Sequence, residues 1–135
     1  MISKPWAGWC NFDLDNFHGR PSYLTNVPID ILESFINYWE NGTGISIYFD
    51  EEGSSFNLVV DPYNVYIIEC KDEPKLIISN KSIEELTAEV ITDIENDFQG
   101  WCNFDTDEEA VEEQTQQLEM LLNKLKQIFH VRYHN

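Results

Sequence analysis

Four β-rich runs in the middle of the chain limit its possible folds more than any other feature. Each run has the length of an ordinary strand and is rich in Ile, Val, Tyr and Phe, which favour strands. Short turns of Asp, Glu, Asn, Gly and Pro separate the runs. This spacing predicts an antiparallel meander with strands at residues 45–49, 55–60, 65–70 and 75–79. Apolar and polar positions alternate in the first and third runs, so we expect helices to cover one face of the sheet.

Three segments have apolar residues at helical spacing and recognisable start signals. Pro28 suits the first turn of the first segment. Ser82 and Glu85 form a capping box at the start of the second, and Thr106 and Glu109 are a possible capping box at the start of the third. We therefore expect helices over residues 28–41, 83–98 and 107–131.

The first 26 residues are less regular. Residues 17–24 could form an extra strand, with Gly19 and Pro21 marking an irregular or edge position. The whole chain, residues 1–135, therefore predicts a single α+β domain in which a four- or five-stranded antiparallel meander is packed by two or three helices.

The charge of the chain is strongly negative and unevenly distributed. The 135 residues include 25 Asp and Glu against 8 Lys and Arg, a net charge of −17, and six of the nine residues from 105 to 113 are acidic. Like charges four residues apart on a helix cost a few tenths of a kcal/mol each. Solubility is one explanation for keeping them, and attraction of a basic partner protein is the other.

If a basic partner binds, we expect it to contact the acidic residues of the third helical segment and of the first hairpin turn. These candidate partner-binding residues are Asp105, Asp107, Glu108, Glu109, Glu112 and Glu113, followed by Asp50, Glu51 and Glu52. Exposed aromatic residues such as Trp6 or Tyr63 could anchor the contact.

Composition also disfavours several classes of protein. A hydrophobic fraction of 42% is too high for a disordered acidic tail. No apolar run approaches the roughly 18 residues of a membrane span, and no signal peptide is visible. A nucleic-acid ligand is not expected, because its phosphates would be repelled. Three cysteines without a Cys-x-x-Cys pair indicate reduced thiols in the cytoplasm, although a bridge between Cys10 and Cys102 stays open.

One short internal repeat stands out. The hexapeptide Gly-Trp-Cys-Asn-Phe-Asp occurs at residues 8–13 and again at 100–105. One interpretation is structural, with the Trp and Phe of each copy closing an end of the core. The other is that the two copies share a ligand surface.

Catalytic and metal-binding signatures are missing from the sequence. His130 and His134 have a spacing that could hold a metal, but as residues near a helix end they fit better as exposed side chains that complement the helix dipole. The Asp13-x-Asp15 pair lacks the Gly and Glu that a calcium loop needs further on. We expect a protein that is not an enzyme and that has no cofactor and no metal site.

The run from Gly19 to Phe35 leads into a predicted helix, which is followed by an acidic hairpin and an acidic helical C-terminal part. This layout resembles immunity proteins of bacterial polymorphic-toxin systems, of which contact-dependent growth inhibition is the best known. The resemblance implies a non-enzymatic cytoplasmic protein that binds and neutralises a cognate toxin domain. Many such toxins are nucleases with basic clefts, which agrees with the charge. It implies no particular binding residues.

Two other functions remain open at this point. The chain could be an acidic mimic of nucleic acid that inhibits another DNA- or RNA-binding protein, or a small-ligand-binding domain in which carboxylates work in a cleft. A phosphate-like line of charge would favour the first, and a pocket lined by the two repeats would favour the second. The sequence does not fix the oligomeric state, and a monomer is the expectation.

Overall fold

The computed structural model describes residues 1–105 and 107–134, the last two by their backbone alone, and these residues form an α+β fold with two antiparallel sheets. The strands are β1 (Ile2–Trp6), β2 (Trp9–Leu14), β3 (Phe17–Gly19), β4 (Ile45–Asp50), β5 (Ser55–Val60), β6 (Val65–Cys70) and β7 (Pro74–Ser79). The helices are α1 (Val27–Asn41), α2 (Ile83–Asn96), α3 (Phe98–Cys102) and α4 (Val111–His134), with a 3-10 turn, η1 (Glu108–Ala110), before α4.

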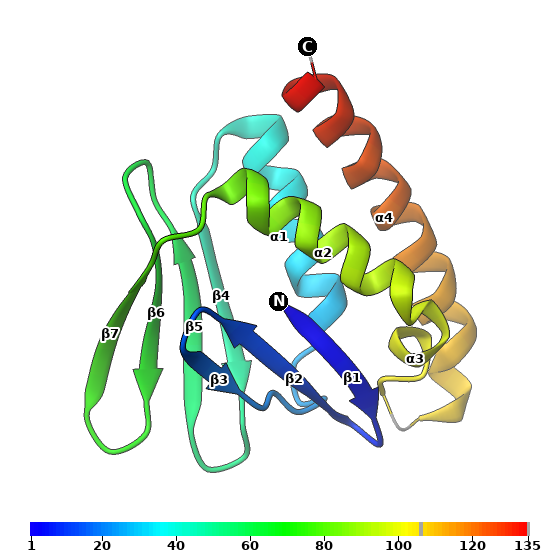
Figure 1. Cartoon of the computed structure of the whole chain (residues 1–135). Helices are drawn as coiled ribbons and strands as arrows, with labels where there is room; N and C mark the ends of the chain where they lie inside the picture. The colour runs from blue at the N-terminus through cyan, green and yellow to red at the C-terminus, as the bar shows by residue number, and fades with distance from the viewer. Residues whose placement is uncertain (106, 135) are drawn as a thin grey trace.

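The larger sheet is the predicted meander, with strand order β4-β5-β6-β7. Its alternation also agrees with the sequence, because Ile45, Ile47 and Phe49 of β4 are buried while Ser46 and Tyr48 between them are exposed. Helix α1 packs on β4 and on α4, and Figure 1 shows the helices on one side of the meander. The predicted four-stranded form of the meander is therefore confirmed.

The N-terminal segment differs from the prediction of one extra strand. It forms a separate three-stranded sheet in the order β1-β2-β3. The predicted strand 17–24 is broken into two pieces: Phe17–Gly19 forms β3, and Ser22 makes an isolated antiparallel bridge with Trp9. A two-residue turn joins β1 to β2, with Ala7 at φ 52° and Gly8 at φ 82°. Two consecutive left-handed residues are the geometry that matches the twist of a tight hairpin.

Four phenylalanines join the two sheets. Phe12 of β2 and Phe17 of β3 pack against Phe49 of β4 and Phe56 of β5, and Phe56 is 4.9 Å from both Phe12 and Phe17 between ring centres. Since aromatic rings bury large apolar areas, this cluster fixes the small sheet over the meander. One apolar core includes residues of both sheets and of α1, α2, α3 and α4.

The helix ends follow local hydrogen bonds. Ser82 caps α2 by accepting the N–H of Glu85 at 3.1 Å, which confirms the predicted capping box start. The predicted end at residue 98 is wrong: α2 ends at Asn96, because Asp97 leaves the helical conformation and its carboxylate caps α3 at the N–H of Gly100.

The third predicted helix begins later and runs further than residues 107–131. Asp107 caps the 3-10 turn η1, and α4 then runs from Val111 to His134. Thr106, predicted as the capping residue, lies outside the described residues.

Candidate protein-binding surface

The acidic segment at residues 105–113 contains two carboxylates that accept backbone hydrogen bonds and four that do not. Asp105 accepts the N–H of Asp107 at 3.0 Å, and Asp107 accepts the N–H of Glu109 at the same distance. These bonds satisfy free amides where the helical segment begins. The first two aspartates of the predicted site therefore have a structural role.

The four glutamates of this segment are fully available to a partner. Glu108, Glu109, Glu112 and Glu113 are exposed, and within the described part of the chain none makes a side-chain hydrogen bond or ion pair. Their position in the first turns of η1 and α4 is favourable to the helix dipole. Mutual repulsion at a spacing of four residues opposes that gain.

The β4–β5 turn holds the second predicted acidic group. Asp50 accepts the N–H of Glu52 at 2.7 Å, and Glu51 accepts the backbone N–H of Arg20 at 2.8 Å and the hydroxyl of Ser54 at 3.1 Å. Two of these three carboxylates thus hold the turn together and join it to the backbone at Arg20. Glu52 is exposed and adopts a left-handed conformation with φ 55°.

Exposed apolar side chains surround the β1–β2 turn. Trp6, at the end of β1, leaves 82% of its surface exposed. Tyr23 and Leu24 are also exposed, and the backbone N–H of Tyr23 ties their segment to the turn by donating to the carbonyl of Gly8 at 2.8 Å. We call Trp6, Tyr23 and Leu24 the aromatic tip. Tyr63, the other aromatic residue named from the sequence, is also exposed but lies on the β5–β6 turn at the opposite end of the meander (Figure 1).

The segment from Arg20 to Asn26 connects the two acidic groups through the aromatic tip. At one end, the N–H of Ser22 donates to the carbonyl of Asp50 at 2.7 Å. At the other end, the side-chain amides of Asn26 and Gln114 bond reciprocally at 2.9 and 3.1 Å, which joins the segment to α4. Figure 1 shows the β4–β5 turn, the β1–β2 turn and the beginning of α4 at one end of the molecule.

Most cations of the described residues lie away from the two acidic groups. Ion pairs join the N-terminal amine to Asp93 at 2.6 Å, and Lys81 to Glu89, Lys124 to Glu40 and Lys126 to Glu95 at 2.6, 3.3 and 2.7 Å. None of the nine predicted site residues takes part in an ion pair among the described residues. Two cations lie close to the tip in the sequence: exposed Lys4, two residues before Trp6, and Arg20, whose guanidinium lies over the ring of Trp9 at 5.8 Å.

The structure distinguishes the two interpretations of the repeated hexapeptide. The first copy lies on β2 and the second at the end of α3, so one sequence adopts two conformations. Phe12, Trp101 and Phe104 are buried in the core, and the indole N–H of Trp101 donates to a carbonyl of α2 at 3.3 Å. Trp9 is half-buried under Arg20. These contacts favour the structural interpretation.

The cysteines are free thiols, and the bridge between Cys10 and Cys102 that the sequence left open is wrong. Each of the two is buried with its own copy of the repeat, one on a strand and the other on a short helix. Burial raises the pKa of the Cys10 thiol to about 12, although Arg20 opposes the rise, and burial also raises the pKa of Cys102. Thiols held in the neutral form are poor nucleophiles.

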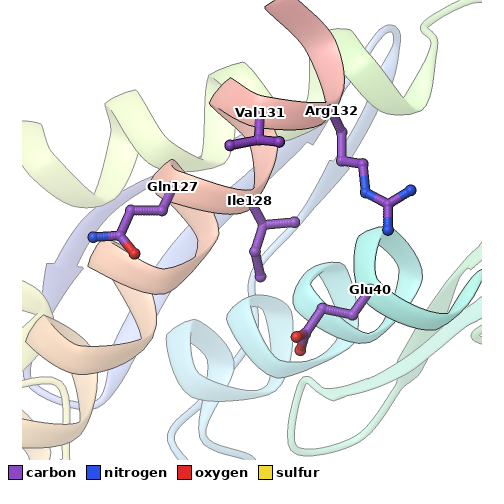
Figure 2. A pocket seen from close by; sticks show the side chains of 5 residues that line it. All are labelled: Glu40, Gln127, Ile128, Val131 and Arg132. Atoms are coloured by element: carbon purple, nitrogen blue, oxygen red, sulfur yellow. The ribbon is translucent and has the colours of Figure 1, made fainter. Parts of the chain in front are cut away.

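The hollows of the surface give little support to a small-ligand site. Five of the hollows have volumes of about 300 to 520 Å³, and none of these five is lined by either copy of the repeat. The hollow in Figure 2 lies between the ends of α1 and α4, where Glu40 and Ile128 point into the space and Arg132 lies over the end of α1. The same Glu40 already pairs with Lys124.

Metal-binding clusters and membrane-spanning helices are both missing from the described residues. No group of three or more His, Cys, Asp and Glu side chains there is placed to hold a metal ion. None of the helices in that part of the chain combines the length and hydropathy of a membrane span. His130 is exposed, as expected from the sequence, and the side chain of His134 lies outside the described residues.

Comparisons with protein-family models, with curated proteins and with solved structures found no match to this chain.

The sequence missed Tyr23 and Leu24, the apolar part of the surface next to Trp6. A weak signal was present, because this pair follows Pro21 and precedes the polar start of α1, outside any periodic apolar pattern. Nothing in the sequence indicated that their segment would bond to the hairpin turn that follows Trp6.

Proposed function

We propose that this protein is a cytoplasmic, non-enzymatic immunity protein that binds and neutralises a basic toxin domain, such as a nuclease. The observation that carries the proposal is the position of the aromatic tip between two acidic groups that no described cation pairs with. A central apolar anchor with a charged rim is the usual arrangement of a protein-binding surface. The three free thiols agree with a reducing compartment.

The charge of the surface supports a basic partner. A nuclease cleft must attract phosphate, so it is positively charged. A chain of net charge −17 attracts such a cleft and speeds its encounter by up to about a thousandfold at low salt. Glu108, Glu109, Glu112 and Glu113 have no competing partners among the described residues, so they can pair with Lys and Arg of a toxin without breaking an internal bond.

The aromatic tip supports a protein rather than an ion as the ligand. Exposed Trp is rare on surfaces that bind nothing, and Trp is among the residues that contribute most to protein interfaces. The left-handed turn of Ala7 and Gly8 and the bond from Tyr23 to Gly8 hold the backbone that carries Trp6 in place before binding. A preorganised anchor loses less entropy when the partner binds.

The first experiment measures the electrostatic contribution to binding of the partner. The protein is used to capture its partner from the native cells, and association and dissociation rates are then measured with that partner over a range of salt. Reversing four charges, by replacing the glutamates at 108, 109, 112 and 113 with Lys, should slow association at least about tenfold and flatten its salt dependence. The matched control reverses four acids elsewhere, two of them also in a first helical turn: Glu33, Asp72, Glu84 and Glu85.

The second experiment measures the contribution of Trp6 to binding of the partner. Trp6→Ala should speed dissociation by about 30-fold or more, with little effect on association, and Tyr63→Ala should leave both rates unchanged. Protection of cells that express the partner should fall with Trp6→Ala and stay unchanged with Tyr63→Ala. Equal effects of the charge reversal and its control would refute this surface, and a captured partner without toxicity would refute the immunity function.

A further inference from the structure

Strand β7 is an open edge of the meander. Among the described residues it pairs only with β6, and Figure 1 shows it at the outer side of the sheet. The opposite edge is different, because α1 packs against β4 and the carbonyl of Asp50 accepts the N–H of Ser22. In an antiparallel ladder alternate residues of an edge strand point their N–H and C=O groups away from the neighbouring strand. Unless covered, such groups are a template for a further strand.

The usual protection against strand pairing covers only one end of β7. Pro74 and Lys75 stand at its beginning, and the Leu76-Ile77-Ile78 that follows carries no charge and no proline. Leu76 and Ile78 are each 60% exposed, and the register places them beside Ile68 and Tyr66 of β6. An apolar strip therefore continues to the edge of the sheet over the second half of the strand.

The local charge favours a second copy of the same chain. Residues 69–81 contain three lysines and three acids, so this hairpin is neutral in a molecule of net charge −17. Two copies that meet along β7 avoid much of the repulsion that opposes contact elsewhere on their surfaces.

Side-chain matching selects one register for two antiparallel copies of β7. A two-fold axis at Ile77 places Leu76 opposite Ile78 of the other copy and Lys75 opposite Ser79. An axis at residue 76 would instead place Lys75 opposite Ile77, and an axis at residue 78 would place Ile77 opposite Ser79. Apolar side chains directly opposite each other are favourable, so the axis at Ile77, which keeps the apolar residues together, is the best match.

We propose that β7 pairs with β7 of a second copy, antiparallel and about a two-fold axis through Ile77, to form one continuous sheet of eight strands from two meanders. Such a self-complementary interface is the commonest way in which identical chains assemble. The proposal replaces the expectation of a monomer. It does not depend on the proposed function, because the aromatic tip and the acidic groups lie on other elements.

Sedimentation tests the association. The chain should dimerise, and added salt should strengthen the dimer because it screens the repulsion between two acidic copies. Binding to a basic toxin would respond to salt in the opposite way, so failure of one proposal is distinguishable from failure of the other. Ile78→Lys should raise the dissociation constant of the dimer at least about tenfold, while the control Tyr63→Lys, at an exposed turn, should not change it. A wild-type monomer at concentrations up to about 1 mM, or a dimer unaffected by Ile78→Lys, would overturn the proposal.

Cysteine crosslinking tests the register, in a chain carrying Cys70→Ser to remove the half-buried thiol. Side chains directly opposite in an antiparallel pair have Cβ atoms about 4.5–5.5 Å apart, close enough for a disulfide after slight adjustment. Ile77→Cys should therefore crosslink to itself on mild oxidation. Leu76→Cys and Ile78→Cys should each stay uncrosslinked alone and crosslink when mixed. Self-crosslinking at 76 or 78 in place of 77 would show that the register is wrong.

Discussion

Replacing Gly19 by Ala should destabilise the fold, because a methyl group there has no room. A Cβ at this position would lie 2.6 Å from Cε1 and 2.9 Å from Cζ of Phe56. Carbon atoms in good contact are about 3.5–4.0 Å apart, so the overlap is about 1 Å. Phe56 is fully buried, and its ring centre lies 4.8–4.9 Å from the rings of Phe12, Phe17 and Phe49. The ring cannot move aside without disturbing three others.

Overpacking of this kind costs about 1–3 kcal/mol. For a chain of 135 residues, the entropy of unfolding makes each kcal/mol equal to about 3–4 °C in Tm. We therefore expect Gly19→Ala to lower Tm by roughly 4–10 °C. Urea unfolding should show the same loss of free energy with an unchanged slope, since the surface exposed on unfolding is the same.

A double-mutant cycle isolates the clash. Phe56→Leu removes the ring that the new methyl would meet, so Gly19→Ala should cost at least about 1 kcal/mol less in that background. A cost below about 0.5 kcal/mol for Gly19→Ala alone, or equal costs in both backgrounds, would refute the close packing of β3 on the meander.

Three other changes test separate features of the fold. In the native protein, alkylating reagents should modify Cys70 first and spare Cys10 and the other buried thiol until unfolding, as mass spectrometry would show. Ala7→Asn should raise the free energy of unfolding by about 0.5–1 kcal/mol, because Asn tolerates the left-handed conformation better than Ala. Lys81→Met should lower it by about 1 kcal/mol at pH 7, because it removes the closer of the two cations that pair with Glu89 and leaves only the N-terminal amine at 3.9 Å. Since the hydrogen bond to Glu89 raises the pKa of Lys81 above its ordinary 10.5, that loss should be complete below about pH 10.5 and vanish as the pH rises through the higher pKa of the folded state.

Local sequence was enough to predict the meander and the main helices. The alternation in residues 45–49 and the polar turns that follow determine β4 and its neighbours, and Ser82 with Glu85 determines the start of α2. The end of α2 was not predictable in the same way. Asp97 can continue a helix or cap the next one, and the choice depends on Trp101 and its packing in the core.

The acidic character of the candidate surface was also readable from the sequence, because charge depends only on composition. What separates a free carboxylate from a structural one is the set of neighbours it finds. Asp50, Glu51, Asp105 and Asp107 hold turns, while Glu52 and the glutamates of η1 and α4 do not. The partners of Asp50, Asp105 and Asp107 lie two residues away in the chain. Glu51 instead accepts the backbone N–H of Arg20, which is 31 residues away.

The sequence by itself determined the sheet, the helices and the net charge, since periodicity, capping and composition act over short distances. Only the tertiary structure decided that one hexapeptide is a strand in one place and a helix end in another, because the partners that bury each copy lie far away in the chain. It also decided that the segment with Tyr23 and Leu24 bonds to the turn that follows Trp6, and that β7 is left at the edge of the sheet. Each of these outcomes depends on contacts between residues that are distant in the chain, and such contacts leave no periodic pattern in the sequence.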